Sequence, residues 1–171
     1  MMRIGHGYDV HRLVKDRPLI LGGVEVDYEL GLLGHSDADV LLHAVCDAIL
    51  GALALGDLGR HFPDTDALYA GISSRELLRQ VIEKMCSKDF RMVNLDATVI
   101  CQQPKLASYI PRMVEVIAED CLVAMDQVNI KATTTEKLGF TGKGEGIAAQ
   151  AVVLLTRDER RLAAKRAVII T

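Results

Sequence analysis

Asp9 and His11 stand two positions apart in the segment "RIGHGYDVH", which has the pattern of a β-strand. Side chains alternate between the faces of a strand, so Asp9 and His11 project from one face and His6 from the other. A carboxylate and an imidazole on one face can begin a metal site. An isolated pair of this kind is more typical of ordinary surface polarity, and a third ligand is needed to decide.

His43 offers that third ligand from the helix expected over residues 37–55. It follows Asp39 by one turn and precedes Asp47 by one turn, so one helical stripe carries all three. We therefore expect one of these carboxylates to accept the second ring N–H of a metal-bound His43. One Asp and two His leave a tetrahedral position open, as in catalytic zinc sites. The alternative is an Asp–His pair on a solvated helix.

The segment "GHSDAD" precedes this helix and contains His35, Ser36 and Asp37. Unpaired N–H groups and the positive end of the helix dipole favour an anion such as phosphate here. A capped helix after a polar turn would explain Ser36 and Asp37 equally well, with Asp37 or Asp39 as the cap. It would leave His35 unexplained.

The segment "ATTTEKLGFTGKGEG" places Thr134 and Glu136 on one face of an expected strand end. A carboxylate among phosphate-binding groups indicates a hard cation such as Mg²⁺. The glycines and Lys143 do not form a P-loop, because the spacing differs and a strand follows. The segment "CQQPKLA", 101–107, joins a strand to a helix and by itself predicts only a connector.

These groups must be positioned by a small set of helices and strands. The hydrophobic pattern predicts a two-layer sandwich of helices and strands, with helices on one face of the sheet. Strands are expected at 3–11, 17–27 (with a bend at Gly22-Gly23), 91–102, 126–136 and 146–156, helices at 37–55, 73–89 (with a capping box from Ser73 to Glu76) and 106–125, and a loop at 56–66.

The strands at 91–102 and 146–156 carry apolar residues at both parities, so the second sheet face also needs burial. No helices remain to cover it, and this predicts a homo-oligomer whose sheets face one another. Residues 1–157 are expected to form a single catalytic domain, with 158–171 a C-terminal extension of unknown role.

Composition narrows the class of protein. The 171 residues are 50% hydrophobic and 25% charged, with a net charge of −3, which is typical of a globular domain and disfavours nucleic acid as a partner. The four cysteines are scattered, which favours a reducing compartment. No secretion leader is visible and the longest apolar run, 48–55, is too short to span a membrane, so we expect a cytoplasmic protein.

Together the segments "RIGHGYDVH", "GLLGHSDADVLLHA", "ALGDLGRHFPDTD", "SSRELL" and "VNIKATTTEKLGFTGKGEGIA" resemble the 2-C-methyl-D-erythritol 2,4-cyclodiphosphate synthases, over about residues 2–156. The resemblance implies an α+β fold with a mixed sheet, and a homotrimer with active sites between adjacent subunits. It also implies an activity in isoprenoid precursor synthesis. A cytidine diphosphate substrate, 4-diphosphocytidyl-2-C-methyl-D-erythritol 2-phosphate, would be cyclised by attack of its 2-phosphate on the β-phosphorus, releasing CMP.

The resemblance also implies roles for individual residues. Asp9, His11 and His43 would bind Zn²⁺, and Glu136 would bind Mg²⁺ or Mn²⁺. His35 and Thr134 would stabilise the transition state. The remaining substrate-binding positions implied are Val10, Ser36, Asp57, Leu58, Gly59, Phe62, Pro63, Asp64, Thr65, Asp66, Cys101, Gln102, Gln103, Pro104, Lys105, Leu106, Ala107, Thr133, Thr135, Phe140 and Lys143, with 101–107 forming the cytosine pocket of the neighbouring subunit.

Two positions depart from the pattern of that family. Lys143 stands where many members have Arg, which exchanges a bidentate phosphate contact for a point charge. Gln150 replaces a Glu that some members have near the trimer axis, where the resemblance implies a binding place for an isoprenoid diphosphate. Two other functions compete: a zinc hydrolase, which has no use for the cytidine segment, and a non-enzymatic isoprenoid-binding oligomer.

Overall fold

The computed structural model describes residues 1–159 and 161; most of the extension expected over 158–171 lies outside the described residues. The strands are β1 (Met2–Val14), β2 (Leu19–Leu21), β3 (Val24–Val26), β4 (Gly31–Leu32), β5 (Phe90–Ile100), β6 (Val128–Thr133) and β7 (Gly146–Arg157). The helices are α1 (Val40–Ala52), α2 (Leu58–His61), α3 (Ser74–Ser87), α4 (Ile110–Cys121) and α5 (Gly139–Gly142), with 3₁₀ turns at Ala67–Tyr69 and Met125–Gln127.

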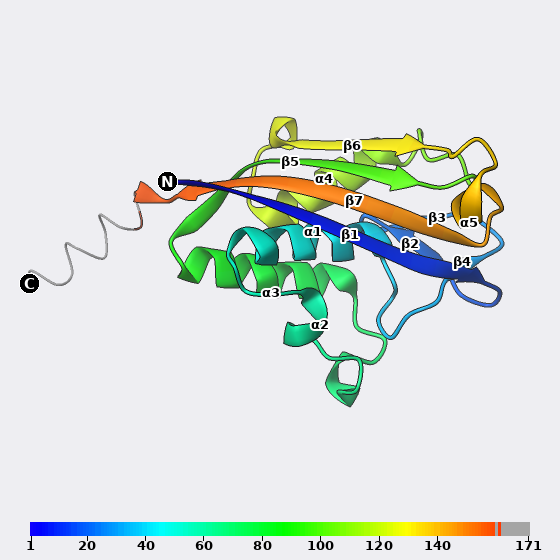
Figure 1. The fold of residues 1–171 in the computed structure, drawn as a ribbon, viewed down its shortest axis with the longest axis horizontal. Helices are drawn as coiled ribbons and strands as arrows, with labels where there is room; N and C mark the ends of the chain where they lie inside the picture. Colours follow the sequence, from blue (N-terminus) through cyan, green and yellow to red (C-terminus); the bar gives the residue numbers. More distant parts are fainter. Residues whose placement is uncertain (160, 162–171) are drawn as a thin grey trace, which may run out of the picture.

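Five strands form one mixed sheet in the order β4-β1-β7-β5-β6. β5 and β6 are parallel, and the other neighbouring strands are antiparallel. The register aligns Val10, Ala148, Ile100 and Thr133 in one row across β1, β7, β5 and β6. The parts of β1 and β6 that carry the predicted site residues therefore lie at the same level along the strands. Across the sheet they are separated by β7 and β5 (Figure 1).

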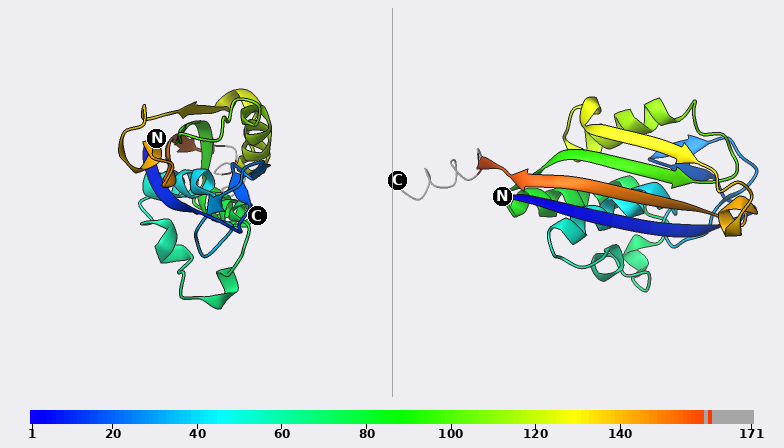
Figure 2. Two further views of the ribbon diagram at one scale, coloured as in Figure 1. Left: turned by 90° about the vertical axis from the view of Figure 1, so that its right-hand side faces the viewer. Right: turned by 45° about the horizontal axis from the view of Figure 1, so that its top comes forward.

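Helices α1, α3 and α4 cover one face of the sheet, which confirms the predicted two-layer sandwich (Figures 1 and 2). α1 packs on β1 and β7, α4 packs beside β6, and α3 lies against both α1 and α4. The buried side chains of this layer form one hydrophobic cluster, built chiefly from Leu, Ile, Val and Ala. No helix in residues 1–159 is long and apolar enough to cross a membrane.

Gly5 and Gly7 determine how closely α1 approaches β1. A Cβ atom at Gly5 would lie 1.8 Å from the carbonyl oxygen of Ala48, and one at Gly7 would lie 1.9 Å from that of Ala44. Only glycine permits this contact between helix backbone and strand backbone. Gly5, Gly7, Asp9 and His11 share one face of β1, so the same approach that needs the glycines brings α1 beside the two polar residues.

The opposite sheet face is uncovered in the single chain. Ile4, Tyr8, Val10 and Val152 are exposed there, together with the polar His6. Exposed apolar side chains in this number on one face are typical of a surface that another molecule covers. The prediction of an apolar face is confirmed only in part, because Asp96, in register with Val152, and its partner Lys131 are also on this face. The predicted direction of His6, away from Asp9 and His11, is confirmed.

Several local predictions were wrong. Residues 56–66 are not only loop, because Asp57 caps the short helix α2. The glycine-rich segment likewise contains α5. The Ser73 side chain makes no capping hydrogen bond at α3; the Ser74 N–H instead donates to Asp37 Oδ2 at 3.0 Å. A carboxylate from a distant segment thus replaces the local capping box. The bend at Gly22-Gly23 is confirmed, with φ of 60° and 73°.

Candidate active site

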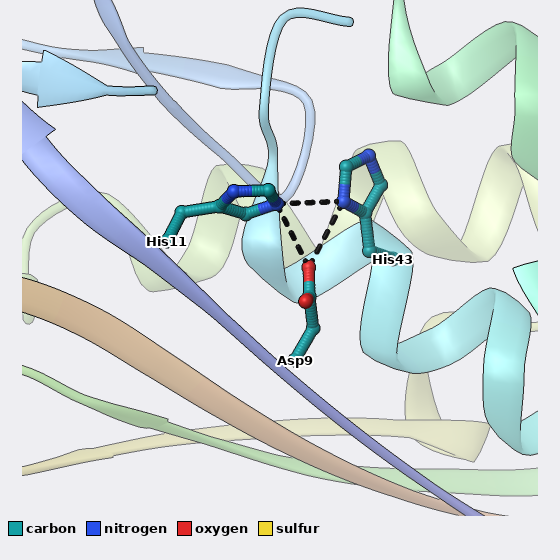
Figure 3. Close-up of side chains that lie close together, drawn as sticks. All are labelled: Asp9, His11 and His43. Carbon is teal, nitrogen blue, oxygen red and sulfur yellow. Dashed lines mark hydrogen bonds and ion pairs between the residues drawn. The ribbon is translucent and has the colours of Figure 1, made fainter. Parts of the chain in front are cut away.

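Asp9, His11 and His43 meet in the space between β1 and the first turn of α1 (Figure 3). Asp9 Oδ2 lies 3.0 Å from His11 Nε2 and 2.9 Å from His43 Nδ1, and the two nitrogens are 3.1 Å apart. Among residues 1–159 and 161, this is the one group of three or more His, Cys, Asp or Glu side chains arranged to share a metal ion.

The outer nitrogen of each imidazole shows where its proton resides. His11 Nδ1 lies 2.8 Å from the Leu33 carbonyl oxygen, which can only accept, so Nδ1 carries the proton. His43 Nε2 lies 2.9 Å from Ser74 Oγ, whose own proton is donated to Asp37 Oδ1 at 2.5 Å. His43 Nε2 therefore donates, and its Nδ1 is unprotonated in the neutral ring.

Three acceptor atoms consequently converge with no donor among them when both rings are neutral. A cation must neutralise them, and without a metal ion a proton takes this place. Burial acts against the charged forms, but the hydrogen bonds and charges outweigh it. They hold the pKa of Asp9 well below its usual range and raise the pKa of His11. A metal ion that binds here must displace protons.

The dimensions of the group suit zinc. Tetrahedral Zn²⁺ with bonds of about 2.0–2.1 Å keeps its ligand atoms about 3.3 Å apart. The observed separations of 2.9–3.1 Å need to widen only by a few tenths of an ångström. Two imidazole nitrogens and one carboxylate oxygen also leave a fourth position open for another ligand.

The prediction that Asp39 or Asp47 accepts the second N–H of His43 was wrong. Asp39 is fully buried, and its oxygens accept from the N–H groups of Gly22, Gly23, Leu41 and Leu42. Asp47 accepts from the Leu58 N–H at 2.7 Å. Helical spacing places these carboxylates on the His43 stripe, but backbone N–H groups already occupy them. Asp39 caps α1 and also binds the turn at Gly22-Gly23, and Asp47 binds the start of α2. Burial raises the pKa of Asp39 to about 6, against the lowering effect of its N–H donors.

Two adjoining cavities surround the triad. One, of about 270 Å³, is lined by His11, His35, Ser36, His43, Leu58, Phe62, Asp64 and Tyr69 among others. The other, of about 510 Å³, is lined by Asp9, His11, His43, Asp47, Asp57, Leu58, Gly59, Phe62 and Asp64. The structure thus brings the predicted metal ligands together with His35, Ser36 and most of the predicted residues at 57–66. We call this group the triad half.

A second group of predicted residues gathers where β5 and β6 end. The Cys101 N–H donates to the Thr133 carbonyl oxygen at 3.0 Å, and the Lys137 N–H donates to Gln102 Oε1 at 3.3 Å. Thr134 Oγ1 donates to Glu136 Oε1 at 2.7 Å. We call this group, residues 101–107 and 133–136, the loop half.

Strand alternation does not produce the Thr134–Glu136 contact. β6 ends at Thr133, and Glu136 has a φ of 51°, so the backbone turns and folds the carboxylate back onto the hydroxyl. Thr135 Oγ1 is used within the loop, where it donates to the Leu138 carbonyl oxygen at 2.6 Å. Cys101 and Leu106 have buried side chains, and burial raises the pKa of the Cys101 thiol to about 11.

The two halves do not meet within one chain. β7 and β5 separate β1 from β6, which places the loop half about 14 Å across the sheet from the triad half. Phe140, on α5, contributes to a third cavity with Val10 and His11, and Lys143 is exposed at the end of α5. His35 and Thr134, both predicted to stabilise one transition state, therefore belong to different halves of a single chain.

A sequence profile of the YgbB family matches residues 2–156, a range that contains both halves. The chain belongs to the YgbB family. The match spans every strand and helix of the sandwich and ends one residue before the end of β7.

Two relatives are similar in sequence to this chain over most of its length. A Thiobacillus denitrificans protein named 2-C-methyl-D-erythritol 2,4-cyclodiphosphate synthase is 64% identical over 156 residues, 91% of this chain and 98% of that protein. A Geobacter sulfurreducens protein of the same name is 67% identical over 154 residues, 90% of this chain and 98% of that protein.

Two solved structures show the same fold. The bifunctional IspDF from Campylobacter jejuni has a TM-score of 0.89 at 43% identity; the match covers 92% of this chain and 42% of that longer one. A 2C-methyl-D-erythritol-2,4-cyclodiphosphate synthase in a CDP-bound form has a TM-score of 0.83 at 34% identity, covering 90% of this chain and 100% of that one.

Sequence reasoning missed the roles of Asp37 and Ser74. Of the two caps predicted for α1, Asp39 is the one that accepts from its first N–H groups, and the sequence predicts no role for Ser74. Ser74 Oγ accepts from His43 Nε2, and Asp37 accepts the Ser74 hydroxyl proton. Their separation of 37 positions leaves no pattern in a single sequence, so this YgbB chain carried no local signal for the pair.

Proposed function

We propose that this chain is a cyclase that converts 4-diphosphocytidyl-2-C-methyl-D-erythritol 2-phosphate into 2-C-methyl-D-erythritol 2,4-cyclodiphosphate and CMP. The observation that carries the proposal is the triad of three convergent acceptor atoms, open to a cavity and accompanied by a hydroxyl–carboxylate pair at the same level of the sheet. The relatives named for this reaction, and a relative with CDP bound, support the same substrate class.

Asp9, His11 and His43 would hold Zn²⁺, and Glu136 would hold Mg²⁺ or Mn²⁺. When bound, these ions would neutralise and polarise phosphate oxygens of the substrate. The donor set and its dimensions favour zinc at the triad. The single carboxylate of Glu136 suits an ion that keeps waters and is shared with substrate phosphates.

The chain's own residues would act by positioning and by charge neutralisation. The attacking 2-phosphate is already an anion, so it needs no strong general base. Placing it beside the β-phosphorus makes the reaction intramolecular. His35, which lines the smaller cavity, and Thr134, in the loop half, would donate hydrogen bonds to the phosphate oxygens where charge develops. Thr134 would release its hydroxyl proton from Glu136 when that carboxylate binds the metal ion. Ser36 and Thr133 lie beside them in sequence.

We infer that the working enzyme is a homotrimer in which sheets face one another and each active site lies between two subunits. The two halves lie at the same level along the strands but are separated across the sheet by β7 and β5. A cyclic head-to-tail arrangement would therefore bring the triad half of one subunit to the loop half of the next. The exposed Ile4, Tyr8, Val10 and Val152 would become buried. This arrangement explains why neither half is complete alone.

The remaining substrate contacts follow from this arrangement. Residues 101–107 would receive the cytosine, chiefly through backbone N–H and C=O groups, since Cys101 and Leu106 direct their side chains into the core. Residues 57–66 would bind the methylerythritol. Lys143 would contact a phosphate as a point charge. An isoprenoid diphosphate on the trimer axis near Gln150, and a cytoplasmic location, are further parts of the proposal.

The test is to incubate the purified protein with the substrate and Mg²⁺ and to follow the products by ³¹P NMR and chromatography. The expected result is CMP and the cyclic diphosphate in equal amounts, with a native mass of three chains. Formation of CMP with an open-chain bisphosphate would favour a hydrolase, because water would then be the nucleophile. Tight binding of a lipid diphosphate without any CMP would contradict an enzymatic function.

A further inference from the structure

A chain of hydrogen bonds runs from the half-buried Asp37 through the buried Ser74 to the buried His43. It links the loop before α1, the first turn of α3 and the first turn of α1. Ser74 is 0% exposed and His43 is 9% exposed, so water has little access to these bonds. Neither Asp37 nor Ser74 belongs to the metal ligands or to the substrate-binding residues proposed above.

The direction of each bond in this chain is determined by the groups present. Asp37 Oδ2 accepts the Ser74 N–H at 3.0 Å, and Asp37 Oδ1 accepts the Ser74 hydroxyl proton at 2.5 Å. A carboxylate only accepts, so the Ser74 hydroxyl must give its single proton to Asp37. The lone pairs of Ser74 Oγ then face His43 Nε2, 2.9 Å away, and require a proton on that nitrogen.

Ser36 cannot reverse this direction. Its Oγ lies 3.1 Å from His43 Nε2 and accepts the Ala38 N–H at 3.0 Å. If Ser36 donated to an unprotonated Nε2, that nitrogen would face the lone pairs of Ser74 Oγ at 2.9 Å. Such a buried repulsion is costly, whereas a protonated Nε2 satisfies both hydroxyl oxygens.

We propose that Asp37 and Ser74 are positioning residues that fix the tautomer and orientation of His43 and thereby make its Nδ1 a metal ligand. The inference rests on the proposed function in that it assumes a metal ion at the triad. A carboxylate acting through a hydroxyl here does what a directly bonded carboxylate does in many metal sites. The role that helical spacing assigned to Asp39 and Asp47 belongs to this pair.

The pair also joins metal binding to the fold of α3. Asp37 Oδ2 satisfies the N–H of Ser74, the first residue of α3, a position where Ser73 makes no side-chain cap. The start of α3 and the orientation of the metal ligand therefore depend on one carboxylate. A bound metal ion, by holding His43, would in turn steady this end of α3.

Two variants test the proposal by different routes. Ser74→Ala removes the nearer acceptor of His43 Nε2 and leaves Ser36 Oγ, whose hydroxyl is then able to donate to an unprotonated Nε2. The metal-binding tautomer is no longer enforced, and zinc binding should weaken about 10–100-fold. Asp37→Asn can present an NH₂ group to Ser74 Oγ, which turns the hydroxyl proton toward His43 and favours the Nδ1–H tautomer. We expect a similar loss of zinc affinity with a changed ring spectrum. Ser73→Ala is the matched control, because the exposed neighbour makes no side-chain capping bond.

Zinc affinity is measured by competition with a chromophoric chelator, and the tautomer of metal-free protein by long-range ¹H–¹⁵N spectra at mildly alkaline pH. Thermal unfolding of the metal-free variants shows whether each one folds. If Asp37→Asn does not fold because α3 loses its cap, the zinc affinity of Ser74→Ala alone tests the inference. If the wild type binds zinc and the zinc affinities of both variants lie within twofold of the wild-type value, the inference about Asp37 and Ser74 is overturned and the proposed metal site is not. A wild type that binds no zinc would overturn the proposed metal site as well.

Discussion

The triad half and the loop half differ in how far one chain completes them. In the triad half, both outer imidazole nitrogens have partners, and His43 is buried. In the loop half, Glu136 is exposed, and Thr134 Oγ1 is hydrogen-bonded to Glu136, a residue of the same exposed turn, through its carboxylate and its N–H. The first is preorganised by the fold of its own chain. The second is a more exposed surface, and in the proposed trimer its geometry would be settled by the substrate and the next subunit.

The largest effect is expected from breaking the preorganised half. His43→Ala should abolish stoichiometric zinc and lower kcat/KM by roughly a thousandfold or more, since several kcal/mol of charge stabilisation disappear. Metal analysis and the CMP assay measure the two losses. His6→Ala is the control for zinc content, because His6 lies on the opposite face of β1. Full zinc content in His43→Ala would contradict the ligand assignment.

The next prediction concerns how the two halves combine. Glu136→Gln alone should lower activity about a hundredfold, with zinc retained. Mixed trimers of Glu136→Gln and His43→Ala chains, formed by co-refolding in equal amounts, should regain activity, because about a quarter of the sites would pair two intact halves. Refolding each variant by itself provides the control. Mixtures no more active than their parents would show that one chain supplies both halves.

The difference between the halves also explains what could be predicted from the sequence. Strand parity placed Asp9 and His11 on one face and excluded His6, and helical spacing brought His43 to the same place. These are local periodicities. The partners of His43 depend on where α3 begins relative to α1, which no periodicity contains. The Thr134–Glu136 pairing was anticipated, but from strand alternation, whereas a turn with positive φ produces it.

A third prediction compares capping carboxylates in buried and exposed surroundings. Asp39→Ala would leave four N–H groups without acceptors at a fully buried position, and should lower the free energy of unfolding by about 3–5 kcal/mol. Asp57→Ala removes the cap of the four-residue α2, where water can replace it, and should cost about 1 kcal/mol or less. Urea denaturation of the metal-free proteins measures both. Equal losses would contradict the assigned difference in solvent access.

The fold was predicted correctly where a hydrophobic periodicity extends over a whole helix or strand. The predictions were wrong where the structure depends on contacts between segments distant in the sequence. The helices at α1, α3 and α4 and the long strands followed from hydrophobic period. The capping box at Ser73 was wrong because Asp37 already supplies an acceptor at that helix end. The four-residue helices α2 and α5 are too short to show a period. The approach of α1 to β1 depends on Gly5 and Gly7, whose effect appears only once their neighbours are known.

The smallest effect is expected at the ion pair of Asp96 and Lys131, on the uncovered sheet face. Both side chains are about half exposed, at 49% and 48%, so Lys131→Met should cost less than about 1 kcal/mol at neutral pH. The Lys131 and Asn129 hydrogen bonds lower the pKa of Asp96 in the folded protein. The stabilisation is therefore present above the ordinary Asp pKa and disappears as the pH falls through the lowered value.

Unfolding of wild type and Lys131→Met at neutral and strongly acidic pH measures this contribution, and the two proteins should converge in acid. Lys15→Met, at an exposed position just after β1, controls for the loss of one positive charge. A cost above about 3 kcal/mol would mean that the pair is desolvated in the assembled protein, because breaking a buried pair leaves an uncompensated charge. The trimer would then pack tightly over β5 and β6, and the loop half would be less open than a single chain suggests.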